Sequence, residues 1–238
     1  GIALVAFIAT LTNGMKASNR EAIEQQIAAD YVVTSLDGYT PFVAAAGDAL
    51  AASPVPEVVT SVRSDGGLVD GVTTEVGGIE PATIAEAYVF DWSEGDDSVL
   101  ATLGTTKAIV SSNYAEDHDI SVGDVLTLRS TADRSAKVTV AGTFDPPPFY
   151  PLIESVNVSA ELFDRLYDRP RNRWTWANVP GEPNDENRAS MEEAIAGFPD
   201  TQLETREEWI DREDADFNEF ISFLYVMLTL AVFVSIFG

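Results

Sequence analysis

The longest hydrophobic stretch of the chain lies at its end. Residues 220–237 read FISFLYVMLTLAVFVSIF and include no charged side chain. A helix needs roughly 18 to 20 apolar residues to cross the hydrocarbon core of a bilayer, and this stretch reaches that length. A buried C-terminal helix of a soluble domain is the alternative, but such a helix normally shows a polar face, which this stretch lacks. The pattern therefore predicts a membrane-spanning helix.

The beginning of the chain is apolar as well. Residues 1–11 read GIALVAFIATL, which is too short to span a bilayer and has no basic segment before it. Helical character continues through residues 15–27, where Ala22, Ile23 and Ile27 form an apolar stripe. We interpret residues 1–29 as the end of a first membrane helix that continues into a stalk. Both ends of the intervening domain would then return to the same membrane face.

Strands and helices alternate in the first part of that domain. Runs rich in β-branched residues predict strands at 30–35 and 57–64, on either side of a helix at 41–53. Residues 64–81 contain the Gly and Asp residues of hairpin turns. This part of the chain predicts a β-α-β unit followed by a hairpin.

Strands dominate the middle of the chain, and the alternation returns after the prolines at 146–148. The predicted middle strands are 107–112, 124–131 and 137–144. The later order of strand, helix, strand, helix, strand is predicted for residues 154–159, 160–168, 173–179, 187–198 and 201–206. The succession α/β, β, α/β indicates an α+β fold.

A capping-box pattern predicts where the last helix begins. Thr205 and Glu208 have the spacing of that motif, and nothing breaks the helix before Gly238. Such a helix is longer than the bilayer core, so its acidic first half would stand outside the membrane as a stalk.

The charge balance restricts the possible partners. The chain has 39 acidic and 14 basic residues, a formal net charge of −25, and its lysines are Lys16, Lys107 and Lys137. This excess argues against nucleic acid, which requires a basic surface, and against docking on anionic lipid. It favours a protein from a high-salt organism over a merely acidic one. The absence of cysteine excludes disulfides, thiolate metal sites and thiol nucleophiles.

Catalytic chemistry finds little support in the sequence. His118 is the only histidine, so an HExxH zinc site is impossible and a Ser-His-Asp triad would have to use it. It lies in AEDHDIS, where a solvated turn is favoured over a metal site, and the same holds for SEGDDS at residues 93–98. No GxxxxGK[ST] loop is present. The sequence predicts no catalytic residue, no cofactor and no metal.

Two segments have features of an exposed surface. The first, FDPPPFYPLI, places Phe144, Phe149, Tyr150 and Leu152 around rigid prolines and is a candidate loop for partner contact. The alternative is that these side chains fold back and fill the seam between subdomains. The second, Asn157-Val158-Ser159, is a glycosylation sequon that could be used where that side faces outward.

Residues 169–179, RPRNRWTWANV, are the one basic island. Alternation with a period of two places Trp174 and Trp176 on one face, which we expect in the core, while the arginines pair with acidic groups.

The co-linear order of several segments resembles a known family. The segments are IAADYVVTS, EVGGIEP, AIVSSNYAEDHDISVGDVLTLRS, KVTVAGTFD, ESVNVSAELFDRLY and the helix leading into FISFLYVMLTLAVFVSIFG. They are similar to the extracytoplasmic domain of MacB-like and FtsX-like ABC transporter permeases over nearly the whole chain. The heavy acidity and the short C-terminal membrane part depart from that family.

The resemblance implies a fold and a set of partners. In that family the domain has a split α/β subdomain with an inserted β-rich subdomain, flanked by two transmembrane or stalk helices. The expected divisions are 1–29 for the first membrane helix and stalk, 30–79 and 153–206 for the α/β subdomain, 80–152 for the β-rich subdomain, and 207–238 for the last stalk and membrane helix.

The implied function is non-enzymatic. The domain would lie outside the cell membrane and couple the motion of a separate cytoplasmic ATP-binding subunit to export or to work on a substrate or partner. A second permease subunit and the lipid bilayer are the other implied partners. A sensor or adhesion ectodomain anchored by two helices is the alternative, and an extracytoplasmic hydrolase lacks a catalytic constellation.

Overall fold

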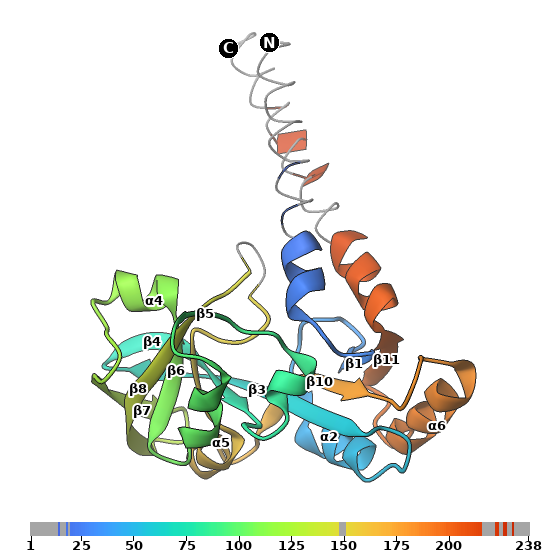
Figure 1. Ribbon diagram of the computed structural model, residues 1–238, viewed down its shortest axis with the longest axis horizontal. Helices are drawn as coiled ribbons and strands as arrows, with labels where there is room; N and C mark the ends of the chain where they lie inside the picture. Colours follow the sequence, from blue (N-terminus) through green and yellow to red (C-terminus); the bar gives the residue numbers. More distant parts are fainter. Residues whose placement is uncertain are drawn as a thin grey trace.

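The fold was obtained as a computed structural model, which describes residues 14, 18, 20–147, 151–215, 222, 223, 226, 227 and 230. Strands and helices both contribute to it (Figure 1). The strands are β1 (Tyr31–Ser35), β2 (Phe42–Val43), β3 (Val58–Val69), β4 (Val72–Ile79), β5 (Asp91–Glu94), β6 (Lys107–Ser111), β7 (Val125–Ser130), β8 (Ser135–Asp145), β9 (Val156–Ser159), β10 (Arg171–Asn178) and β11 (Thr201–Thr205). The helices are α2 (Ala44–Ala51), α3 (Ile84–Ala87), the 3-10 helix η1 (Asp97–Thr102), α4 (Ser112–Asp117), α5 (Ala160–Leu166) and α6 (Asp185–Ile195).

The α/β subdomain is built from two interleaved β-α-β units. Its strand order is β11-β1-β10-β3, and each neighbouring pair is antiparallel. Strands β1 and β3 are therefore parallel, as are β10 and β11, and each pair is separated by a strand of the other unit. This is the split β-α-β arrangement of ferredoxin-like folds. The predicted β-α-β units are confirmed.

Both faces of this sheet are covered. Tyr31 and Val33 of β1 belong to one hydrophobic cluster with Leu50 of α2 and Met191 of α6. Val32, between them in sequence, belongs to a second cluster with Trp176 on the opposite face. Alternation along a strand sends successive side chains to opposite faces, so all five residues of β1 are buried.

Helix α2 lies very close to the sheet at Gly47. A Cβ atom at this position would lie 2.6 Å from Ser61 Oγ, 2.7 Å from Asn172 Nδ2 and 2.9 Å from Thr175 Oγ1. These three buried side chains hydrogen-bond to one another at 2.9 to 3.1 Å. Glycine at this position lets the helix pack onto a buried polar layer.

The β-rich subdomain is a closed ring of strands. Starting from β3, the hydrogen-bonded neighbours are β4, β9, β6, β8 and β7, and β7 pairs with β3 again. Closure leaves no exposed sheet edge in the ring. Valines and leucines from these strands fill its interior, together with Phe163 of α5.

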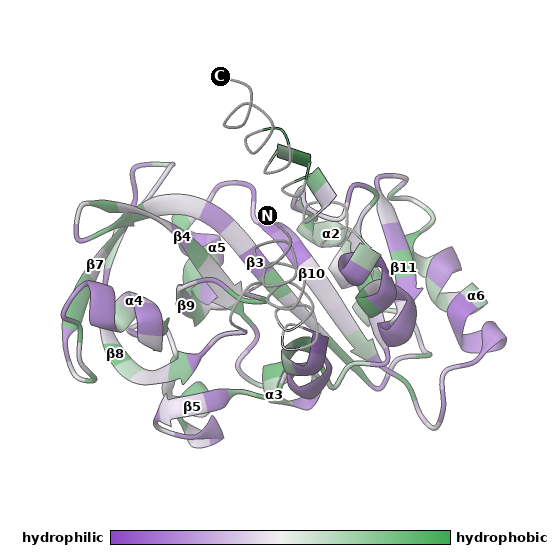
Figure 2. Cartoon of the chain, turned by 90° about the horizontal axis from the view of Figure 1, so that it is seen from above, coloured by the Kyte–Doolittle hydropathy of each residue, from purple (hydrophilic) through white to green (hydrophobic). Residues whose placement is uncertain are grey.

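Strand β3 belongs to both subdomains. Its first half pairs with β10, and its last residues, from Gly67 to Val69, pair with β7. Seen from above, β3 runs from the α/β part into the β-rich part beside it (Figure 2). At the border, Arg63 lies opposite Asn172, next to a register shift in β10. Arg63 also contacts Glu80 at 2.7 Å and Asp164 at 2.8 Å, so residues from both subdomains meet at this arginine.

The strand pairing differs from the predicted divisions at two places. Strand β4 was expected in the α/β subdomain, within 30–79, but it pairs with β3 and β9 as part of the ring. Strand β9 and helix α5 were expected in the α/β subdomain, within 153–206, but β9 pairs with β4 and β6 and completes the ring. The β-rich subdomain therefore begins within β3 and extends through α5. The sequence could not show this, because all four residues of β9 are buried and a short strand that is buried on both faces fits either sheet.

Within the described residues, no helix is both long and apolar enough to cross a membrane. Most of the predicted span at 220–237, and the predicted membrane segment at 1–11, lie outside those residues.

Candidate functional site at the stalk junction

Two helices leave the α/β subdomain from the same face. We call residues 20–26 the N-stalk and residues 206–215 the C-stalk. They lie side by side above the sheet, on the face opposite α2 and α6 (Figure 1). At the junction of these helices with the sheet, hydrogen bonds and salt bridges connect parts of the chain that are distant in sequence.

The first turn of the C-stalk is a capping box, as predicted. The Thr205 N–H donates to Glu208 Oε2 at 2.9 Å, and the Glu208 N–H donates to Thr205 Oγ1 at 3.2 Å. Arg188 of α6 adds contacts to both Glu208 oxygens at 2.8 and 3.0 Å. The Thr205 N–H and the Arg188 guanidinium lower the pKa of the Glu208 carboxyl, in that order of importance.

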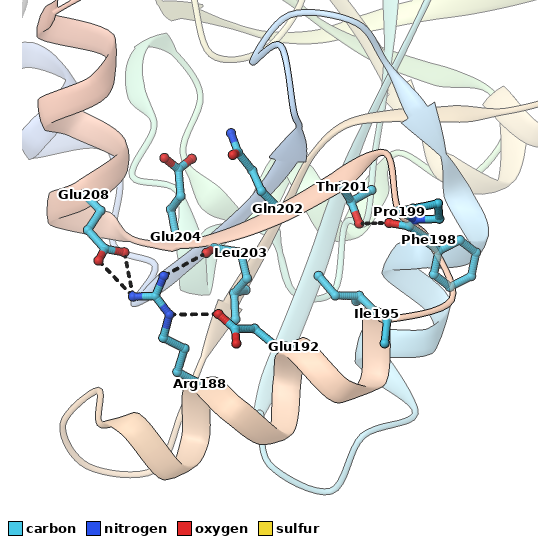
Figure 3. Close-up of a pocket in the computed structure, with 11 residues that line it drawn as sticks. Arg188, Glu192, Ile195, Phe198, Pro199, Thr201, Gln202, Leu203, Glu204 and Glu208 are labelled. Atoms are coloured by element: carbon cyan, nitrogen blue, oxygen red, sulfur yellow. Dashed lines mark hydrogen bonds and ion pairs between the residues drawn. The ribbon is translucent and has the colours of Figure 1, made fainter.

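Arg188 also shields the edge of the sheet. It crosses a hollow of about 510 Å³ between α6 and β11, and its Nη2 donates to the Leu203 carbonyl at 3.4 Å (Figure 3). Strand β11 is the outer strand of the sheet. Together with the Glu208 contact to Thr205, this bond occupies backbone groups that could otherwise pair with another chain.

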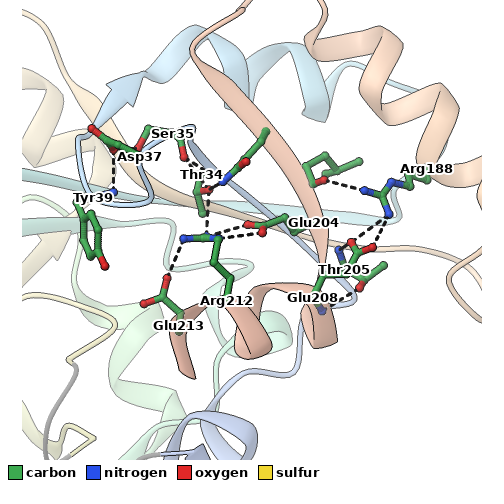
Figure 4. Close-up of polar contacts among 12 residues, drawn as sticks. Thr34, Ser35, Asp37, Tyr39, Arg188, Glu204, Thr205, Glu208, Arg212 and Glu213 are labelled. Atoms are coloured by element: carbon green, nitrogen blue, oxygen red, sulfur yellow. Dashed lines mark hydrogen bonds and ion pairs between the residues drawn. The ribbon is translucent and has the colours of Figure 1, made fainter. Parts of the chain in front are cut away.

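Arg212 joins the middle of the C-stalk to the sheet. Its Nε and Nη2 each donate to one oxygen of Glu204 in β11 at 2.8 Å, and its Nη1 lies 3.2 Å from Glu213 Oε1 (Figure 4). Glu213 is buried, and Glu204 is largely so. Planar bidentate pairs of this kind fix orientation as well as adding energy. Thr34 Oγ1 of β1 lies 3.5 Å from Arg212 Nη2.

Arg20 connects the two stalks to each other. Its guanidinium contacts Glu24 at 2.7 Å within the N-stalk and reaches Asp211 at 3.0 Å and Asp214 at 2.5 Å in the C-stalk. The three carboxylates raise the pKa of Arg20, Asp214 contributing most. Although these groups are partly exposed, one arginine held by three carboxylates aligns the helices.

An aromatic layer lies beneath the stalks. Trp209 of the C-stalk is fully buried and packs edge to face on Trp174, with ring centroids 5.5 Å apart. Tyr88 stacks on Trp176 at 5.7 Å, and its hydroxyl donates to Gln26 of the N-stalk at 2.7 Å. Each stalk therefore contacts the sheet through both apolar and polar groups.

The core position predicted for Trp174 and Trp176 is confirmed, since both are fully buried. The expected pairing of the neighbouring arginines holds for Arg173, which contacts Glu154 at 3.0 Å.

The proposed partner loop is not supported where the structure describes it. Phe144 and Leu152 are fully buried in the core below the stalks, and Phe144 packs edge to face on Phe90. This agrees with the alternative that the segment fills the seam. Phe149 and Tyr150 lie outside the described residues.

The sequon at Asn157 is unsuitable for glycosylation in the folded domain. Asn157 is fully buried in β9, and its Nδ2 donates to the Glu154 carbonyl. Ser159 is the N-cap of α5, where its hydroxyl accepts from the Leu162 N–H. An acceptor asparagine must be accessible, so the predicted glycosylation at Asn157 is wrong for this state.

His118 lies away from the stalk junction. It is exposed, stacks on Tyr114, and its Nδ1 lies 3.0 Å from the Tyr114 carbonyl oxygen. Among the described residues, no three His, Asp or Glu side chains are grouped so as to hold a metal ion. The junction itself offers salt bridges and packing, which hold elements together and transmit displacement.

The junction arginines were missed from the sequence. Helical i,i+4 spacing could have indicated the pairs of Arg20 with Glu24 and of Arg188 with Glu192. The pairs that join separate elements have no such spacing: Arg20 with Asp211 and Asp214, Arg188 with Glu208, and Arg212 with Glu204. The available signal was the scarcity of basic residues in an acidic chain, where each arginine has many possible partners.

Comparison with known proteins agrees with this fold. The periplasmic region of MacB from Actinobacillus actinomycetemcomitans is similar, with a TM-score of 0.56 and 10% sequence identity, over 83% of this chain and 96% of that one. The extracellular domain of the ABC-type transporter YknZ from Gram-positive bacteria gives a TM-score of 0.49 and 12% identity, over 74% of this chain and 98% of that one. No curated protein matches significantly.

The sequence also matches a described domain family. The MacB-like periplasmic core domain matches residues 1–195, which is most of the chain. This chain therefore belongs to the family of MacB-like periplasmic core domains.

Proposed function

We propose that the chain is the extracytoplasmic part of an ABC transporter permease subunit and that it acts as a lever. A separate cytoplasmic subunit would hydrolyse ATP, and a second permease subunit would complete the transporter. Movement at the membrane would pass through the stalks into the α/β subdomain, and from there to the β-rich subdomain, which would act on a substrate or partner without catalysing a reaction.

One observation carries this proposal: both stalks are bonded to the sheet that contains β3. Trp209 and Arg212 hold the C-stalk on that sheet, and Gln26 holds the N-stalk against Tyr88. Strand β3 then runs without interruption into the ring. A tilt of the stalks would therefore become a larger displacement of the distant ring, as in other rigid-body transitions.

A kink in the C-stalk tests the lever. Ala215 is exposed at the end of the described C-stalk, so a proline there meets no core residue. Proline removes a helix hydrogen bond and clashes with the preceding turn, at a cost of about 3 kcal/mol or more. We expect Ala215→Pro to uncouple the ring from the membrane, whereas Ala215→Ser should preserve the helix.

The effect of Ala215→Pro can be measured as a change in the distance between two spin labels, so the substrate does not have to be known. The chain has no cysteine, so a spin label can be placed at Val125→Cys on the exposed start of β7. In the full transporter with its ATPase subunit, the distance between the labels of the two permease subunits should change between the ATP-bound and nucleotide-free states. Ala215→Pro should abolish that change and leave basal ATP hydrolysis measurable.

A substitution of His118 tests the alternative that the domain has a catalytic role. His118→Ala should leave both the distance change and ATP hydrolysis intact, because His118 is exposed and bonds within its own helix. If His118→Ala removed activity while Ala215→Pro did not, the lever proposal would be wrong and a chemical role for residues 116–119 would have to be considered.

A further inference from the structure

Two arginines stand apart from the others. The chain has eleven arginines, and eight of them form salt bridges: Arg20, Arg63, Arg129, Arg134, Arg165, Arg173, Arg188 and Arg212. Arg206 donates to the Glu24 carbonyl. Among the described residues, Arg169 and Arg171 have no carboxylate within the 4.0 Å of a salt bridge, and Arg171 donates to the Pro41 carbonyl at 3.1 Å. Burial raises the pKa of the Asp65 carboxyl, and Arg171 acts on it electrostatically to lower that pKa. Neither arginine forms a salt bridge within the described part of the chain, which is unexpected for two neighbouring arginines in a chain of charge −25.

Apolar side chains are exposed beside these arginines. Leu36 is 62% exposed, Tyr39 is 53% exposed and Val43 is 48% exposed. Val43 in β2 is the sheet partner of Arg171 in β10. We call Leu36, Tyr39, Val43, Arg169 and Arg171 the β2 surface. Aromatic residues and arginine are enriched in protein interfaces, and exposed apolar groups close together indicate a contact site.

Hollows flank the β2 surface on both sides. One, of about 490 Å³, is lined by Leu36, Val43, Phe198 and Asp200, among others. The other, of about 420 Å³, includes Tyr39 and Asp65. Pro41 and Arg171 line both, so they form a ridge between them. A ridge between two hollows can interlock with a copy of itself, as a two-fold interface requires.

The position of the β2 surface suits contact between two subunits in one membrane. The loop with Asp37 and Tyr39 lies beside Arg212 and Glu213 of the C-stalk (Figure 4). A Cβ atom at Gly38 in this loop would lie 2.4 Å from Arg212 Nη1. Two subunits in one membrane have their stalks pointing the same way, so their symmetry axis runs along the stalks and their contact lies on a flank. The β2 surface begins at the base of the C-stalk, on such a flank.

We propose that the β2 surface is the site where a second copy of this chain docks, side by side with the first. The inference rests on the proposed function, which requires two permease subunits. A second copy is strongly acidic, so like charges repel it over most of the surface, whereas Arg169 and Arg171 are exposed, form no salt bridge with any described residue and can receive its carboxylates. In return, Asp200 in one of the hollows offers a carboxylate to the arginines of the other copy.

Disulfide crosslinking suits this test, because these 238 residues contain no cysteine of their own that would compete with the introduced one. Tyr39→Cys is the test variant, and Val125→Cys, 57% exposed on the β-rich subdomain, is the matched control. Both are made in the full transporter in membranes and oxidised with copper phenanthroline. We expect Tyr39→Cys to form covalent dimers at least about tenfold faster, because docking raises the local concentration of the facing thiol.

Reversing the charge of the two arginines provides a second test of the docking site. Adding Arg169→Glu and Arg171→Glu to Tyr39→Cys should slow crosslinking by about tenfold, whereas Arg171→Lys, which keeps the charge, should slow it much less. Circular dichroism of each variant establishes that it is folded. If the variant with Arg169→Glu and Arg171→Glu does not fold, the crosslinking rates of Tyr39→Cys and Val125→Cys still test whether the β2 surface is the docking site.

The subunit count separates the two proposals. Mass measurement on the detergent-solubilised transporter reports whether two permease subunits are present. If two are present and Tyr39→Cys crosslinks no faster than Val125→Cys, the docking site is wrong while the proposed function stands. If one is present, both proposals fail.

Discussion

At the level of single residues, Glu208 connects three parts of the molecule. Its carboxylate accepts from the Thr205 N–H at the start of the C-stalk and from Arg188 on α6. Both contacts favour the ionised form, which is why the pKa lies below its ordinary value of 4.5. The capping box was readable from the spacing in TREE, whereas Arg188 was not, since it comes from another helix.

The lowered pKa predicts a pH-dependent contribution to stability. A carboxyl whose pKa is lower in the folded state stabilises that state above its unfolded pKa and loses the effect as the pH falls through the folded value. Glu208→Gln should therefore reduce the free energy of unfolding at pH 7 by about 0.5–1 kcal/mol, the size expected for a cap and a half-exposed ion pair. The difference from the unmutated chain should shrink below pH 4.5.

Urea unfolding of the full chain in nonionic detergent, at several pH values from 7 to 3, measures this difference. Glu207→Gln is the control, because Glu207 is the exposed neighbour in the same turn and should change stability by less than about 0.5 kcal/mol. A deficit of Glu208→Gln that stays constant down to pH 3 would show that the carboxylate charge does not contribute.

At the level of elements, the C-stalk depends on Trp209 for its position. The indole is fully buried against Trp174, whereas the neighbouring Glu207 is exposed. Besides the salt bridges, Trp209 and Ile210 are the C-stalk residues in the hydrophobic cluster below it, so removal of the larger one should loosen the helix.

Trp209→Ala should lower the free energy of unfolding by about 3–5 kcal/mol, the usual cost of deleting a buried tryptophan. Trp209→Phe keeps an aromatic ring and should cost clearly less. Circular dichroism during denaturant unfolding gives the stability, and amide hydrogen exchange should show faster exchange in residues 206–215 for the alanine variant. Equal protection of this helix in Trp209→Ala and the unmutated chain would mean that the salt bridges suffice to hold it.

Periodicity predicted most elements but not their pairing. The pattern of RWTWANV placed both tryptophans in the core because alternation is local. Strand β9, in contrast, has buried side chains on both faces, so its sequence contained no sign of whether it would join β10 or β6. The apolar residues Phe144 and Leu152 posed a similar difficulty, because prolines around apolar side chains occur in exposed loops and in buried seams alike. Their burial depends on residues of the stalks and β10, which are distant in sequence.

At the level of the whole molecule, charge opposes folding. The 39 acidic residues far outnumber the 14 basic ones, and among the described residues Arg20 alone takes three carboxylates. The remaining carboxylates repel one another across the surface, and this repulsion weakens as salt shortens the screening length.

Salt should therefore stabilise the protein. Two effects compete, because salt also weakens the exposed salt bridges, but each of those contributes only about 0–1 kcal/mol. With a net charge of −25, relief of the repulsion should prevail.

We expect the melting temperature of the full chain in nonionic detergent to rise steadily as potassium chloride is raised toward the molar range, where the screening length is about 3 Å. A variant with Glu116→Gln, Asp117→Asn and Asp119→Asn removes three clustered charges away from the stalks and should start higher and rise less. A melting temperature that stays flat or falls in both proteins would reject repulsion as a determinant of stability, and with it the prediction of a high-salt origin.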